Sequence, residues 1–123
     1  MKRVLIIEDN DNNMELITFI LEAAGYRTYR AFNGCDGVKS THTLKPDIII
    51  LDIQLPDIDG TEVLKQIRSH REFDDTPIIA MTSYAMAGDR EKLLASGCTA
   101  YIEKPIDPER VVSQIEAVYE ENV

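Results

Sequence analysis

Acidic side chains directly follow two short runs of branched apolar residues in this sequence. Glu8 and Asp9 follow the run at residues 4–7, and Asp52 follows the run at residues 48–51. Carboxylates that lie close together repel one another, so we expect a raised pKa for at least one of them if the fold brings them together. A hard divalent cation relieves such repulsion, and a few carboxylates with water and a substrate phosphate commonly bind magnesium. The pattern therefore predicts a Mg²⁺ site.

Two further polar residues, Thr82 and Lys104, follow apolar segments in the same way. Lys104 supplies a positive charge for a phosphate oxygen, and Thr82 supplies a hydroxyl donor. Asp52 would then act as a nucleophile toward phosphorus and form an acyl phosphate, while the metal and Lys104 stabilise the developing charge. The pattern contains neither a histidine base nor a glycine-rich phosphate loop, so we expect no nucleotide hydrolysis and a donor that arrives already activated.

The histidines and cysteines favour magnesium over zinc. His42 and His70 lack the spacing of metal ligands, and Cys35 and Cys98 lack the CxxC spacing of a zinc or redox motif. We expect both cysteines to pack as small apolar side chains, as free cysteines commonly do in cytoplasmic proteins.

Length and charge restrict the possible functions further. A chain of 123 residues fits one domain, predicted to span residues 1–123, and its net charge of −9 disfavours direct binding to nucleic acid or anionic lipid. The apolar run at residues 4–7 is too short for a signal peptide, and no run approaches the roughly 18 apolar residues of a membrane span. We therefore expect a cytoplasmic protein without an attached output domain.

Strand-like runs alternate with segments of helical periodicity along the chain. Strands are predicted at residues 4–7, 27–32, 48–51, 78–81 and 100–102. Helices are predicted at about residues 13–24, up to residue 44, after Gly60, at about residues 86–96 and at about residues 108–120. The second helix is weakened by Gly34 and Gly37, and the last has Asp107 as its predicted N-cap.

This alternation predicts an α/β fold, namely a doubly wound parallel sheet with helices on both faces. In such sheets ligands bind beyond the carboxyl ends of the strands, which is where the polar residues described above lie. The site is therefore expected at one edge of the sheet.

The same residues resemble the receiver domains of two-component response regulators over essentially the whole chain. The resemblance rests on Glu8-Asp9, on IIILDIQLPDIDG at residues 48–60, on Thr82 after IIAM, and on YIEKPI at residues 101–106. The segments EDNDNNMEL and MTSYAMAGD are most similar to stand-alone regulators, including those of cell-cycle or developmental phosphorelays. The family has a five-stranded sheet of flavodoxin-like order 2-1-3-4-5, which the resemblance implies here.

The resemblance also implies a role for each site residue. Asp52 would be the phosphoacceptor, and Mg²⁺ would be held by Glu8, Asp9, Asp52 and the main-chain carbonyl of Gln54. Lys104 and Thr82 would contact the phosphoryl group, and the bond between Lys104 and the following proline would be cis. Thr82 and Tyr101 would form the switch.

The implied partners are a sensor histidine kinase or a histidine phosphotransfer protein as donor, and a downstream effector protein as reader. Such a domain is a regulatory phosphoacceptor rather than an enzyme with a separate substrate. It catalyses only its own phosphorylation and slow dephosphorylation, and we expect a monomer or a weak phosphorylation-dependent dimer. No binding to nucleic acid or membrane is implied.

Three other functions remain as alternatives at this point. An aspartate-nucleophile hydrolase typically has a second Asp two residues after the nucleophile, but Gln54 stands there. A flavin- or nucleotide-binding protein of similar topology needs a hydroxyl- or glycine-rich phosphate loop after the first strand, where this chain has EDNDNN. A degenerate receiver, acting as a phosphorylation-independent interaction module, would keep the fold without the complete polar set.

Overall fold

The computed structural model describes residues 2–83 and 87–121, and this part of the chain forms a five-stranded sheet. The strands are β1 (Arg3–Ile7), β2 (Arg27–Ala31), β3 (Ile48–Asp52), β4 (Ile78–Thr82) and β5 (Ala100–Glu103). All are parallel, in the order β2-β1-β3-β4-β5. The expected doubly wound sheet of flavodoxin-like order is confirmed.

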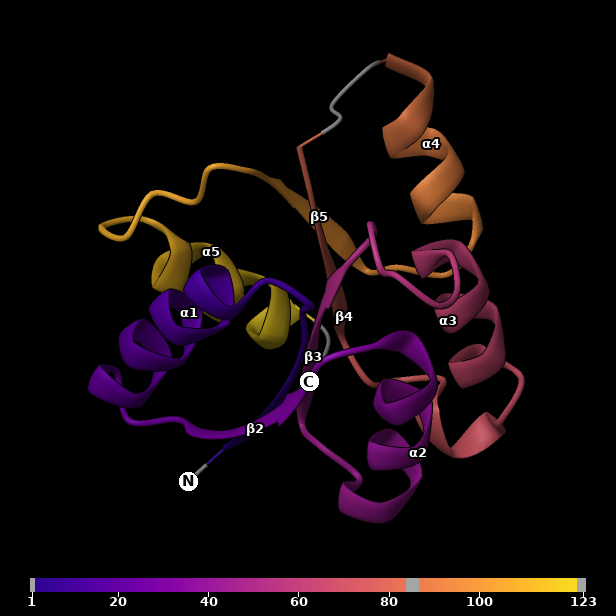
Figure 1. Cartoon of the computed structure of the whole chain (residues 1–123), viewed down its shortest axis with the longest axis horizontal. Helices are drawn as coiled ribbons and strands as arrows, with labels where there is room; N and C mark the ends of the chain where they lie inside the picture. Colours follow the sequence, from indigo (N-terminus) through magenta and orange to yellow (C-terminus); the bar gives the residue numbers. More distant parts are fainter. Residues whose placement is uncertain (1, 84–86, 122–123) are drawn as a thin grey trace.

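Helices connect the strands and cover both faces of the sheet. They are α1 (Asp11–Ala23), α2 (Gly34–Leu44), α3 (Gly60–Arg68), α4 (Ala87–Ala95) and α5 (Val111–Glu121). A short 3-10 helix, η1 (Arg71–Phe73), follows α3 and was not predicted. Figure 1 shows α1 and α5 on one face and α2, α3 and α4 on the other. The predicted arrangement of helices on both faces is therefore confirmed.

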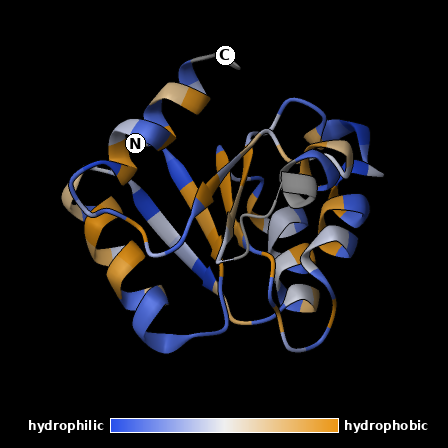
Figure 2. Ribbon diagram, turned by 90° about the horizontal axis from the view of Figure 1, so that it is seen from above, coloured by the Kyte–Doolittle hydropathy of each residue, from blue (hydrophilic) through white to orange (hydrophobic). Residues whose placement is uncertain are grey.

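The central strands are apolar throughout because both of their faces are covered. Successive side chains of a strand point to opposite faces, so Ile48 and Ile50 pack in the core beneath α1 and α5. Their neighbours Ile49 and Leu51 pack in the second core, beneath α3 and α4. Figure 2 shows the resulting apolar centre of the sheet. A continuous apolar run, rather than an alternating one, is what a strand buried on both faces requires.

Side-chain caps decide where the first two helices begin. α1 begins at Asp11 rather than near Asn13, because the side chain of Asn10 accepts a hydrogen bond of 2.9 Å from the N–H of Asn13. The weak second helix is confirmed, and its N-cap is Asn33, whose side chain accepts from the N–H of Asp36 at 2.8 Å.

The last helix begins later than predicted. α5 starts at Val111, so the predicted start at Pro108 is wrong. Residues 108–110 form a turn in which the Asp107 side chain accepts from the N–H of Glu109 at 3.0 Å. Asp107 thus caps this turn, and its carbonyl accepts from the N–H of Val111 at 2.9 Å. The predicted start of the fourth helix at Met86 lies outside the described residues.

The two cysteines differ in their surroundings. Cys98 is buried in the core beneath α3 and α4, as expected, and burial raises the pKa of its thiol to about 11. Cys35 is exposed, so the expectation that it packs as an apolar side chain is wrong. It lies in the first turn of α2. Within residues 2–83 and 87–121, no helix combines the length and apolar character needed to span a membrane.

Candidate functional site

Polar residues from four strands meet at the edge of the sheet where the strands end. Glu8 follows β1, Asp52 and Thr82 are the last residues of β3 and β4, and Lys104 follows β5. Backbone hydrogen bonds continue the sheet past these ends. The N–H of Glu8 donates to the carbonyl of Ala31 at 3.0 Å, and the N–H of Lys104 donates to the carbonyl of Thr82 at 2.8 Å. Backbone hydrogen bonds of the sheet therefore fix the main chain at Glu8 and Lys104.

Lys104 contacts two buried carboxylates. Its Nζ lies 2.9 Å from Glu8 Oε1 and 3.3 Å from Asp52 Oδ1. Glu8 is 2% exposed and Asp52 is 4% exposed, so water screens these charges only weakly. Burial opposes the charged form of Lys104, but its contacts with Glu8 and Asp52 outweigh burial and raise its pKa. Lys104 is therefore a permanent cation of the site.

The acid–base properties of Asp52 follow from the same contacts. Burial and a hydrogen bond with Glu8 raise the pKa of Asp52 to about 7, although the N–H of Gln54 donates to its Oδ1 at 3.1 Å. Burial also opposes ionisation of Glu8, but hydrogen bonds with Asp52 and Lys104 lower its pKa. Near neutral pH the two buried carboxyl groups thus share a proton. The expected raised pKa in a crowded group of carboxylates is confirmed.

Three acids form an acidic cluster, defined here as Glu8, Asp9 and Asp52. One carboxylate oxygen from each lies within 4.8 Å of the other two. Glu8 and Asp52 are buried, whereas Asp9 is exposed and leaves the cluster open to solvent. Burial and the contact with Glu8 raise the pKa of Asp52 despite the nearby Lys104, and a hard cation with oxygen ligands would replace the shared proton. The donor set therefore fits a magnesium ion.

Two backbone features were expected near the site, at Gln54 and at the peptide bond after Lys104. The N–H of Gln54 points at the Asp52 carboxylate, whereas the role of its carbonyl as a metal ligand stays a prediction. The peptide bond between Lys104 and Pro105 is cis, as the resemblance implied.

Thr82 and Tyr101 lie on neighbouring strands. In the register of β4 and β5, Thr82 pairs with Glu103 and Tyr101 pairs with Ala80. Tyr101 is half-buried and packs against the core beneath α3 and α4. It also lines a groove of about 610 Å³ along β5 and the segment that leads into α5. Thr82 is thus close to the acidic cluster in the sheet, and Tyr101 faces the groove; their role as a switch stays a prediction.

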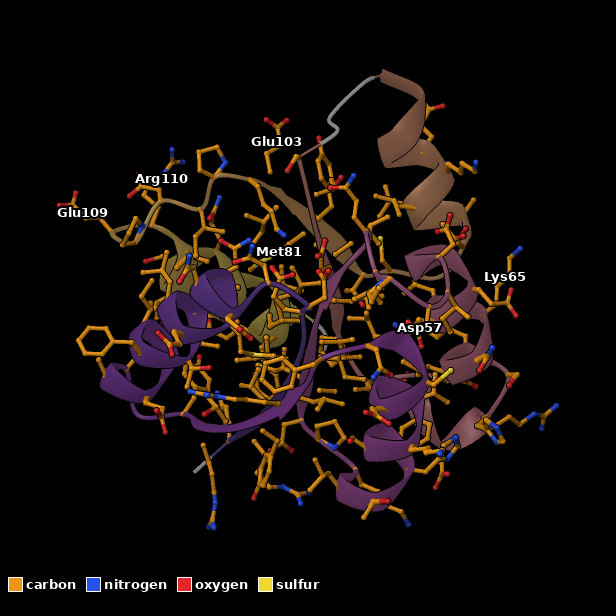
Figure 3. The ribbon with its side chains drawn as sticks, in the orientation of Figure 1. Asp57, Lys65, Met81, Glu103, Glu109 and Arg110 are labelled. Carbon is orange, nitrogen blue, oxygen red and sulfur yellow. The ribbon has the colours of Figure 1, made fainter. Side chains whose placement is uncertain are left out.

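Asp57 is a site-adjacent residue that sequence reasoning missed. It lies in the loop between β3 and α3, and its carboxylate accepts hydrogen bonds of 2.8 Å from the N–H groups of both Gly34 and Cys35. Figure 3 labels Asp57 close to α2. The partners are 23 and 22 residues away along the chain, so no local pattern indicates this contact. The sole signal in the sequence is an Asp in the loop after Asp52.

The histidines lie apart from the acidic cluster. The rings of His42 and His70 meet edge to face with centroids 4.4 Å apart, and His42 Nδ1 is 3.7 Å from Glu72 Oε1. Among the side chains that the structure describes, the acidic cluster is the group of three or more potential ligands that lie close enough to share a metal ion. The preference for magnesium over zinc therefore agrees with the geometry.

Comparison with known proteins points to one family. A family model described as the response regulator receiver domain matches residues 4–116. The polar-differentiation response regulator DivK of Brucella anthropi is 42% identical over 116 residues, which are 94% of this chain and 94% of that protein. DivK of Brucella ovis is 41% identical over the same length and the same share of each chain.

Solved structures agree with this result. The chemotaxis response regulator CheY4 of Vibrio cholerae is 26% identical, with a TM-score of 0.92 over 96% of this chain and 98% of that one. The receiver domain of the sensor histidine kinase PA1611 from Pseudomonas aeruginosa is 31% identical, with a TM-score of 0.89 over 97% of this chain and 98% of that one. That structure has a magnesium ion coordinated in its active site cleft.

Proposed function

The chain belongs to the response regulator receiver domain family of two-component systems, and on that premise we propose that residues 1–123 act as one phosphoacceptor switch. Members of this family are regulatory rather than catalytic. Asp52 takes a phosphoryl group from a phosphohistidine, and the phosphorylated domain then binds other proteins with altered affinity. The observation that carries the proposal is the position of Asp52 within the acidic cluster, 3.3 Å from the Lys104 ammonium group.

The nucleophile in this proposal is the ionised carboxylate of Asp52. One of its oxygens attacks phosphorus while the N–P bond of the phosphohistidine breaks, and the electron pair of that bond stays on the imidazole nitrogen of the donor. The product is an acyl phosphate. The proton shared with Glu8 has to leave before attack, and a pKa of about 7 makes its loss inexpensive near neutral pH. The contribution of the buried pair, Glu8 and Asp52, is therefore a nucleophile that can lose its proton near neutral pH.

Magnesium would be held by Glu8, Asp9 and Asp52, together with the main-chain carbonyl of Gln54. When bound, it neutralises the charge of the carboxylates and of the phosphoryl oxygens. The mutual distances within the acidic cluster and the raised pKa of Asp52 support this assignment. The magnesium ion in the related PA1611 receiver domain supports it further.

Lys104 and Thr82 would hold the phosphoryl group after transfer. The group adds about 1.5–2 negative charges, so we expect Lys104 Nζ to exchange its contact with Asp52 for a phosphoryl oxygen. The Thr82 hydroxyl would donate to another phosphoryl oxygen. The domain would catalyse only its own phosphorylation and its own slow dephosphorylation, so no separate substrate is proposed.

The proposed partners follow from this chemistry. A sensor histidine kinase or a histidine phosphotransfer protein supplies the phosphoryl group, and a downstream effector protein reads it through the switch formed by Thr82 and Tyr101. In this proposal the domain does not contact nucleic acid or membrane. It is a monomer or a weak phosphorylation-dependent dimer. The cytoplasmic location expected from the sequence remains part of this proposal.

A degenerate receiver that works without phosphorylation is the second candidate. A receiver that has lost phosphorylation does not need the ion pairs of Lys104 with Glu8 and Asp52. This structure has both pairs, at 2.9 Å and 3.3 Å. Burial of the charged groups of Glu8 and Asp52 also carries a desolvation penalty, which lowers the stability of the fold. These observations favour the phosphoacceptor.

Incubation with acetyl phosphate, with and without magnesium, tests the proposal. Intact mass should show one added phosphoryl group in the presence of magnesium and little without it. Asp52→Asn keeps the size of the side chain but removes the nucleophile, so it should fold and remain unlabelled. Asp59→Asn is the matched control, since Asp59 is an exposed acid in the following loop that caps α3, and it should label like the wild type. Equal labelling of Asp52→Asn and the wild type would refute the assignment.

A further inference from the structure

The loop between β3 and α3 is attached to a helix on the same face of the sheet by Asp57. Asp57 Oδ1 accepts from the N–H of Gly34 and Oδ2 accepts from the N–H of Cys35, each at 2.8 Å. The first N–H groups of a helix have no partner within the helix. α2 already has a cap of its own, because Asn33 accepts from the N–H of Asp36. Asp57 therefore adds a second cap that comes from a distant segment of the chain.

The ionisation state of Asp57 agrees with this contact. Hydrogen bonds from the backbone N–H groups of Cys35 and Gly34 hold the pKa of Asp57 well below its usual range. The carboxylate is thus anionic, and it lies at the positive end of the α2 dipole. Both of its oxygens are occupied by α2, so a side chain with one acceptor oxygen could make only half of the contact.

Packing holds the same part of the loop against α2. Ile58 follows Asp57 and packs against the core beneath α3 and α4. A Cβ atom at Gly34 would lie 2.5 Å from Ile58 Cγ1, so the glycine lets the loop approach the backbone of α2. The middle of the loop therefore touches α2 through one polar and one apolar side chain.

The ends of the loop are attached to the site. The N–H of Gln54 donates to Asp52 Oδ1 at 3.1 Å, and the N–H of Ile53 donates to the carbonyl of Met81 at 3.2 Å. At the other end the N–H of Gly60 donates to the carbonyl of Ile53 at 3.0 Å. Between Gln54 and α3, the Asp59 side chain caps α3 itself, whereas the Asp57 side chain bonds the loop to α2.

From these contacts we infer that Asp57 is a positioning residue for the metal site: by holding the loop on α2, it keeps the main chain at Gln54 in place beside Asp52 and thereby sets the affinity for magnesium. Asp57 does not itself belong to the acidic cluster. The inference rests on the proposed function, because it takes the Gln54 carbonyl as a ligand. Residues that orient the ligands of a metal commonly affect its binding without touching it.

The test compares magnesium affinity with stability in matched variants of the whole chain. Asp57→Ala should weaken binding of Mg²⁺, measured by titration calorimetry with magnesium chloride alone, by about 10-fold or more. Asn33→Ala is the matched control, since it removes the other cap of α2 but leaves the loop attached. It should lower the melting temperature to a similar extent and keep the affinity for magnesium within about twofold of wild type. Asp57→Asn should be intermediate, because its amide has one acceptor oxygen.

A second readout follows the loop directly in the magnesium-free protein. Amide hydrogen exchange at Gln54 should be faster in Asp57→Ala than in the wild type, and unchanged in Asn33→Ala. Unaltered magnesium affinity in Asp57→Ala, or an equal loss in Asn33→Ala, would overturn the inference while leaving the proposed function intact. A wild-type protein that binds no magnesium would instead overturn the proposed function, and this inference with it.

Discussion

In the proposed function, Asp52 has to meet two opposing requirements at the residue scale. As a nucleophile its carboxyl group must be ionised, but ionisation next to Glu8 in a buried place is unfavourable. Lys104 neutralises part of this charge from 3.3 Å, but burial and the hydrogen bond with Glu8 still raise the pKa of Asp52 to about 7. Below that pH a proton occupies the carboxyl group that magnesium needs. Proton binding and magnesium binding should therefore compete.

The affinity for magnesium is predicted to depend on pH through this competition. A carboxyl group with a raised pKa is mostly protonated below that pKa and ionised above it. The affinity should thus rise with pH and level off above pH 7, and it should be about 10-fold weaker at pH 6 than at pH 8. Titration calorimetry in buffers that do not bind magnesium measures this difference.

Glu8→Gln provides the control for this prediction. It removes the acid that, in addition to burial, raises the pKa of Asp52, so the weaker magnesium binding of this variant should vary less between pH 6 and pH 8. Equal affinity of the wild-type protein at the two pH values would contradict the competition.

At the scale of elements, a glycine lets α2 approach β1. A Cβ atom at Gly37 would lie 2.6 Å from Ile7 Cδ1 and 2.9 Å from both Cγ atoms of that side chain. Ile7 is fully buried at the end of β1, directly before Glu8, and cannot turn away. The glycine that weakens the helical pattern in the sequence is therefore a requirement of packing.

Gly37→Ala is predicted to destabilise the protein although Ala favours helices. Overpacking a core costs about 1–3 kcal/mol, and the better helix propensity of Ala returns about 1 kcal/mol. The difference is a net loss of up to about 2 kcal/mol in the free energy of unfolding, measured by urea denaturation. Lys39→Ala, at an exposed position of the same helix, should change stability by less than about 0.5 kcal/mol.

A double mutant tests the cause of this loss. Ile7→Val removes Cδ1, the atom nearest to the added methyl group, so it should relieve part of the strain. The double variant should then be more stable than the sum of the two single changes predicts, by about 0.5 kcal/mol or more. Strict additivity would show that the close approach of α2 is not the cause.

At the scale of the whole molecule, the site and a surface groove share two neighbouring strands. Thr82 ends β4 beside the acidic cluster, and Tyr101 lies on β5 and lines the groove. Figure 3 labels Glu103 and Arg110, which line the same groove beyond Tyr101. Affinity for an effector can change only if a surface differs between the two states. In the proposed function, β4 and β5 would connect the phosphoryl site with such a surface.

Thr82→Ala is predicted to separate phosphorylation from its readout. The variant should still accept a phosphoryl group on Asp52, but lose most of the gain in partner binding, an expected coupling of about 1–3 kcal/mol. Amide spectra with and without beryllofluoride should show smaller shifts at residues 91–112 than in the wild type. Ser83→Ala removes the adjacent, exposed hydroxyl and should respond normally. Identical shifts in Thr82→Ala and the wild type would exclude this switch.

The sequence by itself determined the fold and the members of the candidate site. Apolar runs at residues 4–7, 48–51 and 78–81 predict strands buried on both faces, and the helical segments between them require parallel pairing. Parallel strands end at one edge, so the residues that follow them converge whatever the details of packing. This is why Glu8, Asp52 and Lys104 could be grouped from their positions alone, and why a raised pKa could be expected.

Contacts between segments far apart in the chain were decided only by the tertiary structure. The attachment of Asp57 to α2, the edge-to-face contact of His42 with His70, and the exposure of Cys35 depend on how the helices pack on the sheet. Hydrophobic periodicity indicates which face of a helix is buried, but not which loop meets its first turn. That choice requires the positions of both elements in space, because the hydrogen-bond partners belong to different local patterns.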